Sequence, residues 1–316
     1  MYALRLTPAL KDYIWGGDAL KGKWGKKTDK NIIAESWELS CHKDGESVIF
    51  NGEYKGMTLS EFIEKHPEST GTRAKAFQFF PILIKLIDAK QNLSIQVHPS
   101  DEYALANEGQ FGKSEMWYIV DAKPGAGVYC GFKRQLKPED VARALRQNRI
   151  LEVLNFIEVQ KGDSIYIPAG TVHAICGGLL ICEVQQNSSL TYRLYDYDRV
   201  DKNGNKRELH IEKSLKVIDS SRVSKVNAGV LDLDDETRLL ASCKYFEVLE
   251  RTVIDRLKLK GTPETFVSLT VVEGYGEILV DGHTDNLNLG DTCFIPAGYD
   301  YTITGRNMKV IEARLP

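Results

Sequence analysis

Two polar side chains that could bind one metal ion lie in residues 93–99, which read Leu-Ser-Ile-Gln-Val-His-Pro. In an extended strand the apolar residues of this segment face one side and the polar residues face the other, as expected where a strand separates a core from a cavity. Gln96 and His98 are two residues apart and therefore point in the same direction, with Ser94 beside them. We expect both to reach the same ion.

Two more residues could complete the site. Glu115 follows His98 by 17 residues and begins an otherwise apolar strand, and His173 stands where another apolar strand meets a turn. The candidate ligand set is therefore Gln96, His98, Glu115 and His173. Two imidazoles, a carboxylate and an amide suit zinc or another borderline divalent ion with a position open for a substrate. The alternative is that both histidines are ordinary core residues, which is the more common state of an isolated histidine.

The segment that ends at His173 occurs twice in the chain. Residues 161–173 and 289–301 both contain Gly-Asp, three further residues, Ile-Pro-Ala-Gly and two more residues before the position of His173 or Tyr301. Gly-Asp favours a turn, the apolar run favours a strand, and Pro-Ala-Gly ends that strand. The repeat predicts two related β-domains, and the exchange of histidine for tyrosine predicts that the first alone carries a metal.

A carboxylate and two cations form a second group of candidate site residues. Glu183 and Gln185 share one face of a predicted strand, and Arg193 lies on the next strand after a polar loop. We expect this hairpin to bring Glu183 and Arg193 to one wall of the cavity, as an acid-base group and a charge-stabilising cation. A structural ion pair is the alternative. Lys113 is either a point charge for a phosphate group or an ordinary surface lysine.

The elements that must position these residues are mostly short strands separated by turn residues, as in sandwiches and jelly rolls. Helices are predicted as insertions at residues 58–66, 100–108, 138–147 and 208–220. In the first of them Thr58 and the glutamate three residues later form a capping box. The sequence thus predicts a mainly-β chain with helical insertions.

The length of 316 residues predicts about two domains. Residues 227–236 are polar and acidic, and we interpret them as the boundary. The predicted units are residues 1–230, a metal-binding catalytic domain with the helical insertions, and residues 240–316, a smaller β-domain that lacks the metal histidine.

Composition excludes several classes of function. The net charge of −3 gives no basic field for nucleic acid or an anionic membrane. Six cysteines without a Cys-x-x-Cys pair, and no secretory signal, favour a reducing cytoplasm. The apolar stretch 79–87 is too short to span a bilayer and contains Lys85. We expect a cytoplasmic monomer or homodimer.

Taken together, the motifs resemble the zinc-dependent, cupin-type mannose-6-phosphate isomerases in their short bacterial form, over nearly the whole chain. The matching segments, in order, are Tyr-Ile-Trp-Gly-Gly at 13–17, Glu-Ser-Trp-Glu-Leu-Ser at 35–40, residues 94–99, Lys-Ser-Glu-Met at 113–116, residues 167–174, Glu-Val-Gln-Gln-Asn-Ser at 183–188 and Thr-Tyr-Arg at 191–193. The resemblance implies two cupin-like jelly-roll domains. It also implies one zinc ion per chain at the four candidate ligands.

The resemblance further implies a reaction, the reversible isomerisation of mannose 6-phosphate and fructose 6-phosphate through an enediol. Arg193 would be a catalytic cation, and Glu183 is our candidate for the base that moves the carbon-bound proton. Lys113 would hold the substrate phosphate, with Ser94 and Gln185 as further contacts to this small sugar phosphate.

Two positions depart from the family pattern. Ser189 stands where family members usually have aspartate, and Gly112 stands before Lys113 where many longer relatives have histidine. Two other functions compete with the isomerase. A cupin oxygenase or epimerase is one, although oxygenases tend to bind iron with three histidines and Gln96 is a neutral ligand. A sugar-phosphate binder without catalysis is the other.

Overall fold

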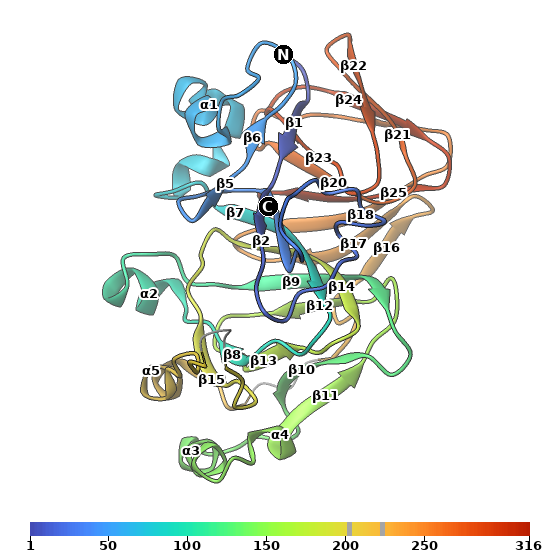
Figure 1. The fold of residues 1–316 in the computed structure, drawn as a ribbon. Helices are drawn as coiled ribbons and strands as arrows, with labels where there is room; N and C mark the ends of the chain where they lie inside the picture. Colours follow the sequence, from blue (N-terminus) through green and yellow to red (C-terminus); the bar gives the residue numbers. More distant parts are fainter. Residues whose placement is uncertain (201–203, 222–224) are drawn as a thin grey trace.

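The computed structural model describes residues 1–200, 204–221 and 225–316, and strands dominate it, as predicted (Figure 1). The first sandwich has a six-stranded sheet in the order β12 (Ser164–Ile167), β9 (Glu115–Ala122), β14 (Leu179–Gln186), β7 (Ile82–Ala89), β3 (Glu35–Leu39) and β2 (Ala9–Lys11). Its second sheet has the order β11 (Leu154–Glu158), β10 (Gly127–Phe132), β13 (His173–Ile175), β8 (Ile95–Val97) and β15 (Tyr192–Tyr195). All pairings within them are antiparallel.

The second sandwich pairs a large sheet with a small one. The eight-stranded sheet has the order β16 (Leu231–Asp234), β17 (Thr237–Ser242), β18 (Glu247–Val253), β25 (Met308–Arg314), β20 (Val267–Glu273), β23 (Thr292–Ile295), β1 (Leu4–Thr7) and β6 (Val48–Ile49). The four-stranded sheet has the order β19 (Arg256–Leu259), β24 (Tyr301–Gly305), β21 (Gly276–Val280) and β22 (His283–Leu287). A small hairpin, β4 (Cys41–His42) and β5 (Gly45–Glu46), stands apart.

The two sandwiches share a hydrophobic core. Ile84 and Tyr118, on the six-stranded sheet, belong to one buried cluster with Val248 and Phe294 of the eight-stranded sheet. Each fully buried side chain of this kind stabilises the fold by about 1.5–3 kcal/mol. Strands of the six-stranded sheet therefore have two buried faces, one toward the second sandwich and one toward the interior of the first.

The alternation predicted for the strand before Pro99 is confirmed in β8. Ile95 and Val97 pack in a cluster with Val141 of α3 (Pro138–Arg146) and Ile150 of α4 (Ile150–Val153), outside the sandwich. Gln96 points the other way and lines a cavity between the sheets. One strand thus separates a core from a cavity.

The predicted repeat forms equivalent turns in the two sandwiches. The Asp163 carboxylate accepts the backbone N–H of Gln160 at 2.9 Å, and the Asp291 carboxylate accepts that of Asn288 at 2.8 Å. The first copy continues into β12 and β13, and the second into β23 and β24, which lie in the two sheets of their own sandwich. The repeat therefore builds the same strand-turn-strand unit in both places.

The predicted helices are present, with bounds that differ by a few residues. They are α1 (Leu59–Lys65), α2 (Asp101–Asn107), α3 and α5 (Ile211–Val217). In α1 the Thr58 side chain accepts the Glu61 N–H at 3.2 Å, and the Glu61 carboxylate accepts the Thr58 N–H at 2.9 Å. This is the expected capping box. Two short 3₁₀ helices, Pro67–Thr70 and Arg73–Ala76, follow α1.

The second sandwich includes strands from before the expected domain boundary. Strands β1 and β6, from the N-terminal part of the chain, pair within the sheet of the second sandwich. The predicted linker at 227–236 contains β16, a strand with four exposed residues that pairs with β17. An edge strand with both faces exposed resembles a linker in the sequence, because no buried face imposes an apolar pattern on it.

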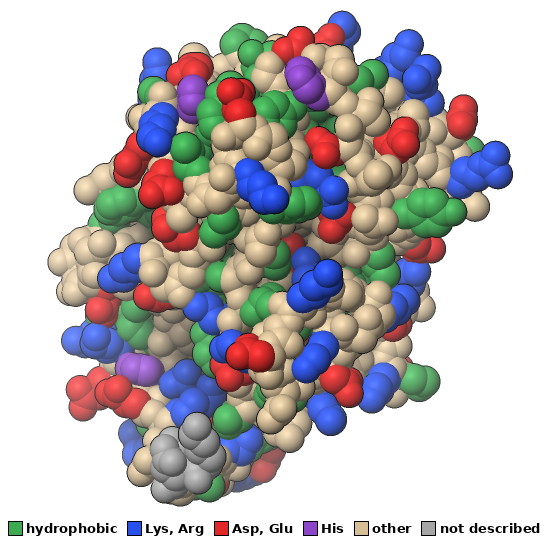
Figure 2. All heavy atoms as spheres, turned by 45° about the horizontal axis from the view of Figure 1, so that its top comes forward, with side chains coloured by type: hydrophobic (Ala, Val, Ile, Leu, Met, Phe, Trp, Pro, Cys, Tyr) green, Lys and Arg blue, Asp and Glu red, His purple; other side chains and the backbone are tan. Residues whose placement is uncertain are grey.

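The surface agrees with the small net charge. Basic and acidic side chains are interspersed over the face shown in Figure 2. Among the described residues, no helix is long and apolar enough to cross a membrane.

Candidate metal centre and active-site pocket

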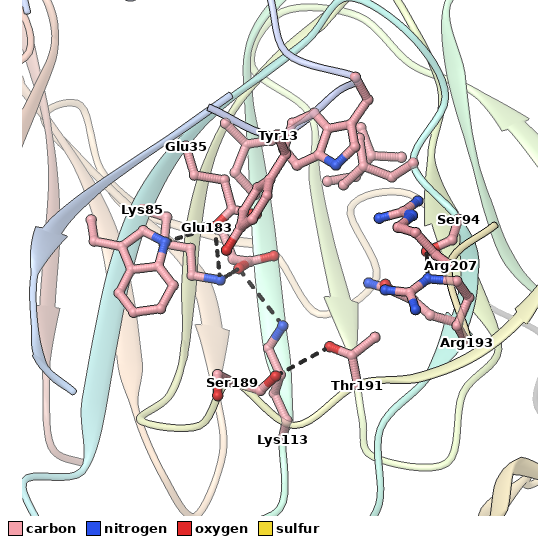
Figure 3. A pocket seen from close by; sticks show the side chains of 16 residues that line it. Tyr13, Glu35, Lys85, Ser94, Lys113, Glu183, Ser189, Thr191, Arg193 and Arg207 are labelled. Carbon is pink, nitrogen blue, oxygen red and sulfur yellow. Dashed lines mark hydrogen bonds and ion pairs between the residues drawn. The ribbon is translucent and has the colours of Figure 1, made fainter. Parts of the chain in front are cut away.

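A cavity of about 290 Å³ opens between the two sheets of the first sandwich (Figure 3). Its polar and charged lining residues are Tyr13, Glu35, Lys85, Ser94, Gln96, Lys113, Glu183, Ser189, Thr191, Arg193 and Arg207. Five of these, Glu35, Lys85, Gln96, Glu183 and Arg193, lie on strands, so their positions are fixed by packing on the opposite strand face.

Three of the predicted metal ligands meet beside this cavity. His98 Nε2 lies 3.5 Å from Glu115 Oε2, and His173 Nε2 lies 3.3 Å from Glu115 Oε1. The potential ligand atoms of the three side chains lie within 4.8 Å of one another, and all three residues are buried. Segments separated in sequence by up to 75 residues, counted from His98 to His173, thus converge on one point.

Backbone carbonyls orient both imidazoles. His98 Nδ1 lies 2.8 Å from the Leu190 carbonyl oxygen, and His173 Nδ1 lies 2.8 Å from that of Thr171. Because a carbonyl oxygen can only accept, Nδ1 must carry the proton in each ring. Each Nε2 then has its lone pair directed at Glu115, as in a histidine that binds a metal through Nε2.

Gln96 completes the predicted set from the neighbouring strand. It is the direct cross-strand partner of His173, and its Nε2 lies 3.3 Å from His173 Nε2. The two ends of an amide have the same shape, and half a turn of the amide places Oε1 at this point. The structure therefore brings all four predicted ligands together.

The chemistry of the group fits a divalent cation. Glu115 is fully buried, and the polar groups next to its carboxylate are the Lys113 ammonium and the two imidazole nitrogens. Burial alone would raise the pKa of Glu115, but Lys113 and the two imidazoles hold it well below its ordinary value. Burial, followed by Lys113, lowers the pKa of His98 to about 3, and burial also lowers the pKa of His173. The site thus presents one carboxylate and two neutral imidazoles.

Lys113 belongs to the same cluster. Its Nζ lies 2.8 Å from Glu115 Oε2 and 3.3 Å from His98 Nε2, and it is 3.9 Å from Glu183 Oε1. The residue is 5% exposed, so the alternative of an ordinary surface lysine is wrong. Its charge faces the ligands rather than the cavity mouth.

Glu183 lies at the back of the cavity in a network of buried charges. Its Oε2 accepts the Trp117 indole N–H at 2.8 Å, and its Oε1 lies 3.3 Å from Lys85 Nζ. Lys85 also pairs with Glu35 at 3.5 Å. Burial, and then the negative charge of Glu115, raise the pKa of Glu183. A carboxylate of this kind is suited to accept a proton.

Arg193 faces Glu183 from the opposite sheet. Glu183 lies on β14 and Arg193 on β15, so the expectation that a hairpin places them on one wall is wrong. The polar loop between the two strands carries the chain across the sandwich. Arg193 is the cross-strand partner of Gln96, and its Nε donates to Ser94 Oγ at 3.3 Å.

Gln185 is not among the residues that line the cavity. Its Nε2 donates to the carbonyl oxygens of Gln186 and Ser188, both at 2.7 Å. The side chain thus holds the loop that leads toward β15. Nothing in this geometry offers its amide nitrogen to a substrate.

The two departures from the family pattern have structural counterparts. Ser189 lines the cavity, and its hydroxyl donates to Asp44 Oδ2 at 3.1 Å, so a carboxylate from another segment lies next to it. Gly112 packs against the start of α2, where an added Cβ would lie 2.4 Å from the Asp101 nitrogen. This backbone has no room for a histidine.

Sequence reasoning missed three charged residues of the cavity, Glu35, Lys85 and Arg207. For Lys85 the signal is a charge inside an apolar strand, the same signal that identified Glu115. Glu35 stands within a matching motif without an assigned role. Arg207 has no signal, because it lies in a loop whose path the sequence does not determine.

Comparisons with known proteins agree with this geometry. Residues 3–125 match the model of the phosphomannose isomerase type I catalytic domain, and residues 235–314 match the mannose-6-phosphate isomerase cupin domain. The mannose-6-phosphate isomerase ManA of Bacillus subtilis is 38% identical over 93% of both chains. That of Streptococcus mutans is 37% identical over 93% of this chain and 92% of its own.

A solved structure of a similar protein has the same fold. The crystal structure of the mannose 6-phosphate isomerase from Bacillus subtilis superimposes with a TM-score of 0.90 and 35% identity, over 99% of both chains. The expected cupin-type fold is therefore confirmed. This chain belongs to the mannose-6-phosphate isomerase family.

Proposed function

We propose that the cavity of the first sandwich interconverts mannose 6-phosphate and fructose 6-phosphate through an enediol. One observation carries the proposal: a buried cluster of two histidines and a glutamate lies beside a cavity that also holds a buried carboxylate and several cations. An aldose-ketose isomerase needs these parts, a group that moves a proton and groups that stabilise charge on the substrate oxygens.

Zinc is the metal that we propose, one per chain, held by Gln96, His98, Glu115 and His173. The support is the donor set of imidazole, carboxylate and amide, together with the two carbonyls that orient the rings. When bound, such an ion supplies a Lewis acid for the substrate oxygens.

Glu183 is the proposed base. It takes the proton from C2 of the aldose and returns it to C1, while a proton moves from O2 to O1, so the reaction is balanced without a co-reactant. Its raised pKa and its position on the cavity wall favour proton transfer. Lys85, 3.3 Å away, stabilises the ionised form.

Arg193 is the proposed catalytic cation. Its guanidinium stabilises negative charge on the enediolate oxygens from the wall opposite Glu183. Ser94 accepts a hydrogen bond from its Nε and holds it in the cavity. The register of Arg193 with Gln96 keeps this charge next to the ligand set.

We assign to Lys113 a role different from the expected one, which was to hold the substrate phosphate. A lysine 2.8 Å from Glu115 and buried beside His98 is adjacent to the reacting end of the substrate. We assign it to the orientation of Glu115 and Glu183 and to charge balance between these two carboxylates.

These assignments give the two predicted domains different roles. We propose that residues 1–230 hold all catalytic residues and that residues 240–316 form a supporting β-domain. The cytoplasmic location, the choice between monomer and homodimer, and the absence of a nucleic-acid partner stay sequence-based predictions.

Nuclear magnetic resonance of the zinc-loaded protein with mannose 6-phosphate in heavy water tests the proposal. Formation of fructose 6-phosphate with deuterium at the migrating carbon position is the expected result. Conversion with little exchange would support the isomerase activity but contradict a solvent-exposed enediol. The migrating hydrogen would then be a proton shielded from solvent or would move as a hydride. Saturable binding without conversion would contradict catalysis and favour a sugar-phosphate binder.

A further inference from the structure

The cations of the cavity form two groups, which Figure 3 shows on opposite sides. The first group consists of Lys85 and Lys113. Lys85 Nζ lies 3.5 Å from Glu35 and 3.3 Å from Glu183, and Lys113 Nζ lies 2.8 Å from Glu115. Three carboxylates therefore balance two ammonium groups. Both ammonium groups at this end are therefore engaged with carboxylates, and the charge of the proposed zinc ion is used at the reacting end of the substrate.

The second group is rich in guanidinium. Arg207 Nε donates to Asp196 at 2.8 Å, and Arg199 pairs with the same carboxylate. Arg193 lies next to them and makes no ion pair with a carboxylate of the described residues; its contacts are Ser94 Oγ and the Glu208 carbonyl oxygen. Two guanidinium groups thus share the buried Asp196 carboxylate and Arg193 has no carboxylate partner, which leaves an excess of two positive charges in this group.

The nearest additional carboxylate does not cancel this excess. The Glu208 side chain is 82% exposed, so water and salt screen its charge more strongly than that of the buried Asp196. Two excess positive charges match a phosphate monoester, which carries a charge of about −1.5 to −2 at neutral pH. Charge thus favours the arginine side for the anionic end of the substrate.

The length of the substrate also favours the arginine side of the cavity for the phosphate. A hexose 6-phosphate reacts at C1 and C2, next to the metal ligands, and carries its phosphate at the far end of the chain. Lys113 adjoins the ligands and has a side chain that is 6% exposed, whereas the Arg207 side chain is 26% exposed. Arg207 also lies across the cavity from Lys113 and Glu183 (Figure 3), which suits the end of the substrate that is far from the reacting carbons.

We propose that Arg207 binds the phosphate of the substrate and determines the preference for phosphorylated over free sugar. This assignment rests on the proposed isomerase function. Asp196 holds Nε and Nη2 of the guanidinium and leaves Nη1 outside that pair. A guanidinium held in this way is preorganised for a charge-assisted hydrogen bond to phosphate.

The test compares Arg207→Gln with Arg199→Gln as the matched control. Both variants remove one guanidinium from Asp196, but Arg199 does not line the cavity. For Arg207→Gln we expect the KM for mannose 6-phosphate to rise about 10- to 100-fold with kcat changed less than about threefold, because uniform binding is lost. For Arg199→Gln the KM should rise less than about threefold. Zinc content should be unchanged in both.

Calorimetric titration with mannose 6-phosphate, free mannose and inorganic phosphate separates this proposal from the isomerase itself, because it needs no turnover. Loss of affinity for the two phosphate compounds alone in Arg207→Gln supports the phosphate site even if the wild type fails to isomerise. Equal weakening for free mannose, or equal effects of the two variants, would overturn it. If the glutamine variant does not fold, Arg207→Lys keeps a positive charge but loses the planar guanidinium, and a smaller loss of affinity for the same two phosphate compounds is expected.

Discussion

The two sandwiches place the same turn and strand at equivalent points, yet one copy ends in His173 and the other in Tyr301. The following strand carries a buried glutamate in each case, Glu183 on β14 and Glu312 on β25. What differs is how the buried charges around these residues are satisfied.

In the second sandwich the buried charged side chains pair with one another. Glu312 accepts from Arg251 Nε at 2.7 Å and from Nη2 at 3.3 Å, and Arg251 Nη1 donates to Thr237 at 2.8 Å. Burial raises the pKa of Tyr301 well above its ordinary value, so its hydroxyl stays protonated and can donate to Glu312. The glutamate is paired without any ligand.

In the first sandwich the corresponding charged residues include three that line a cavity, Lys85, Lys113 and Glu183. Both oxygens of Glu115 and Oε1 of Glu183 are buried, and the groups next to them are lysine ammonium groups and imidazole nitrogens at 2.8–3.5 Å. The charges that line the cavity can meet a ligand there. The comparison shows that the fold alone does not make a site, because the same framework is a structural support where its buried charges pair only with one another and a candidate site where they line a cavity.

Replacement of the residue that distinguishes the two repeats should have the largest effect. In His173→Ala we expect zinc and activity to be lost together, with turnover reduced by about three to four decades or more, since a Lewis acid supplies several kcal/mol. Metal analysis and steady-state kinetics measure the two losses. The matched control is Tyr301→Phe, which should retain zinc and activity. A His173→Ala protein with full zinc would remove His173 from the ligand set.

Glu183→Gln should reduce turnover by about a thousandfold while zinc remains bound, because the proposed base is lost. A base acts in its ionised form, so activity should fall as pH drops through the raised pKa of Glu183, above the range of an ordinary glutamate. The pH profile of kcat/KM with saturating zinc measures this acid limb. It should disappear in Glu183→Gln and persist in Glu35→Gln, which removes the other carboxylate on Lys85. Persistence in both variants would assign the limb to another group.

Much of this site could be predicted from the sequence, because it depends on local periodicity. Alternation along residues 93–99 placed Gln96 and His98 on the cavity face, and the comparison of the two repeats marked His173. A charge at the start of an apolar strand marked Glu115. Each of these signals is set by a few neighbouring residues.

The remainder depends on how distant segments meet. The sequence cannot show that the loop after Glu183 carries Arg193 to the opposite sheet, nor that Lys113 turns toward Glu115 instead of the cavity mouth. The pairing of β1 with β23 spans almost the whole chain and leaves no local pattern. Sequence motifs identified most of the polar residues of the cavity, and tertiary packing determines what each one faces.

Arg193→Ala should lower turnover by about a hundredfold, as expected when a charge that stabilises a developing oxyanion is removed. Zinc content should remain within the error of the wild type, because Arg193 contacts Ser94 and a backbone carbonyl rather than the histidines or Glu115. Metal analysis and kinetics on the same sample measure both quantities. Equal losses of zinc and turnover would make Arg193 a structural residue of the ligand strand.

Glu312→Gln should have the smallest effect on activity and the clearest effect on stability. It leaves the buried Arg251 guanidinium without its carboxylate, which should lower the free energy of unfolding by about 3–5 kcal/mol. Denaturant unfolding measures the loss, and kcat of the folded fraction should be unchanged. The double variant Glu312→Gln with Arg251→Met removes the orphaned charge as well and should recover part of the stability. If Glu312→Gln instead lowered kcat with stability intact, the second sandwich would take part in catalysis and the contrast between the two repeats would fail.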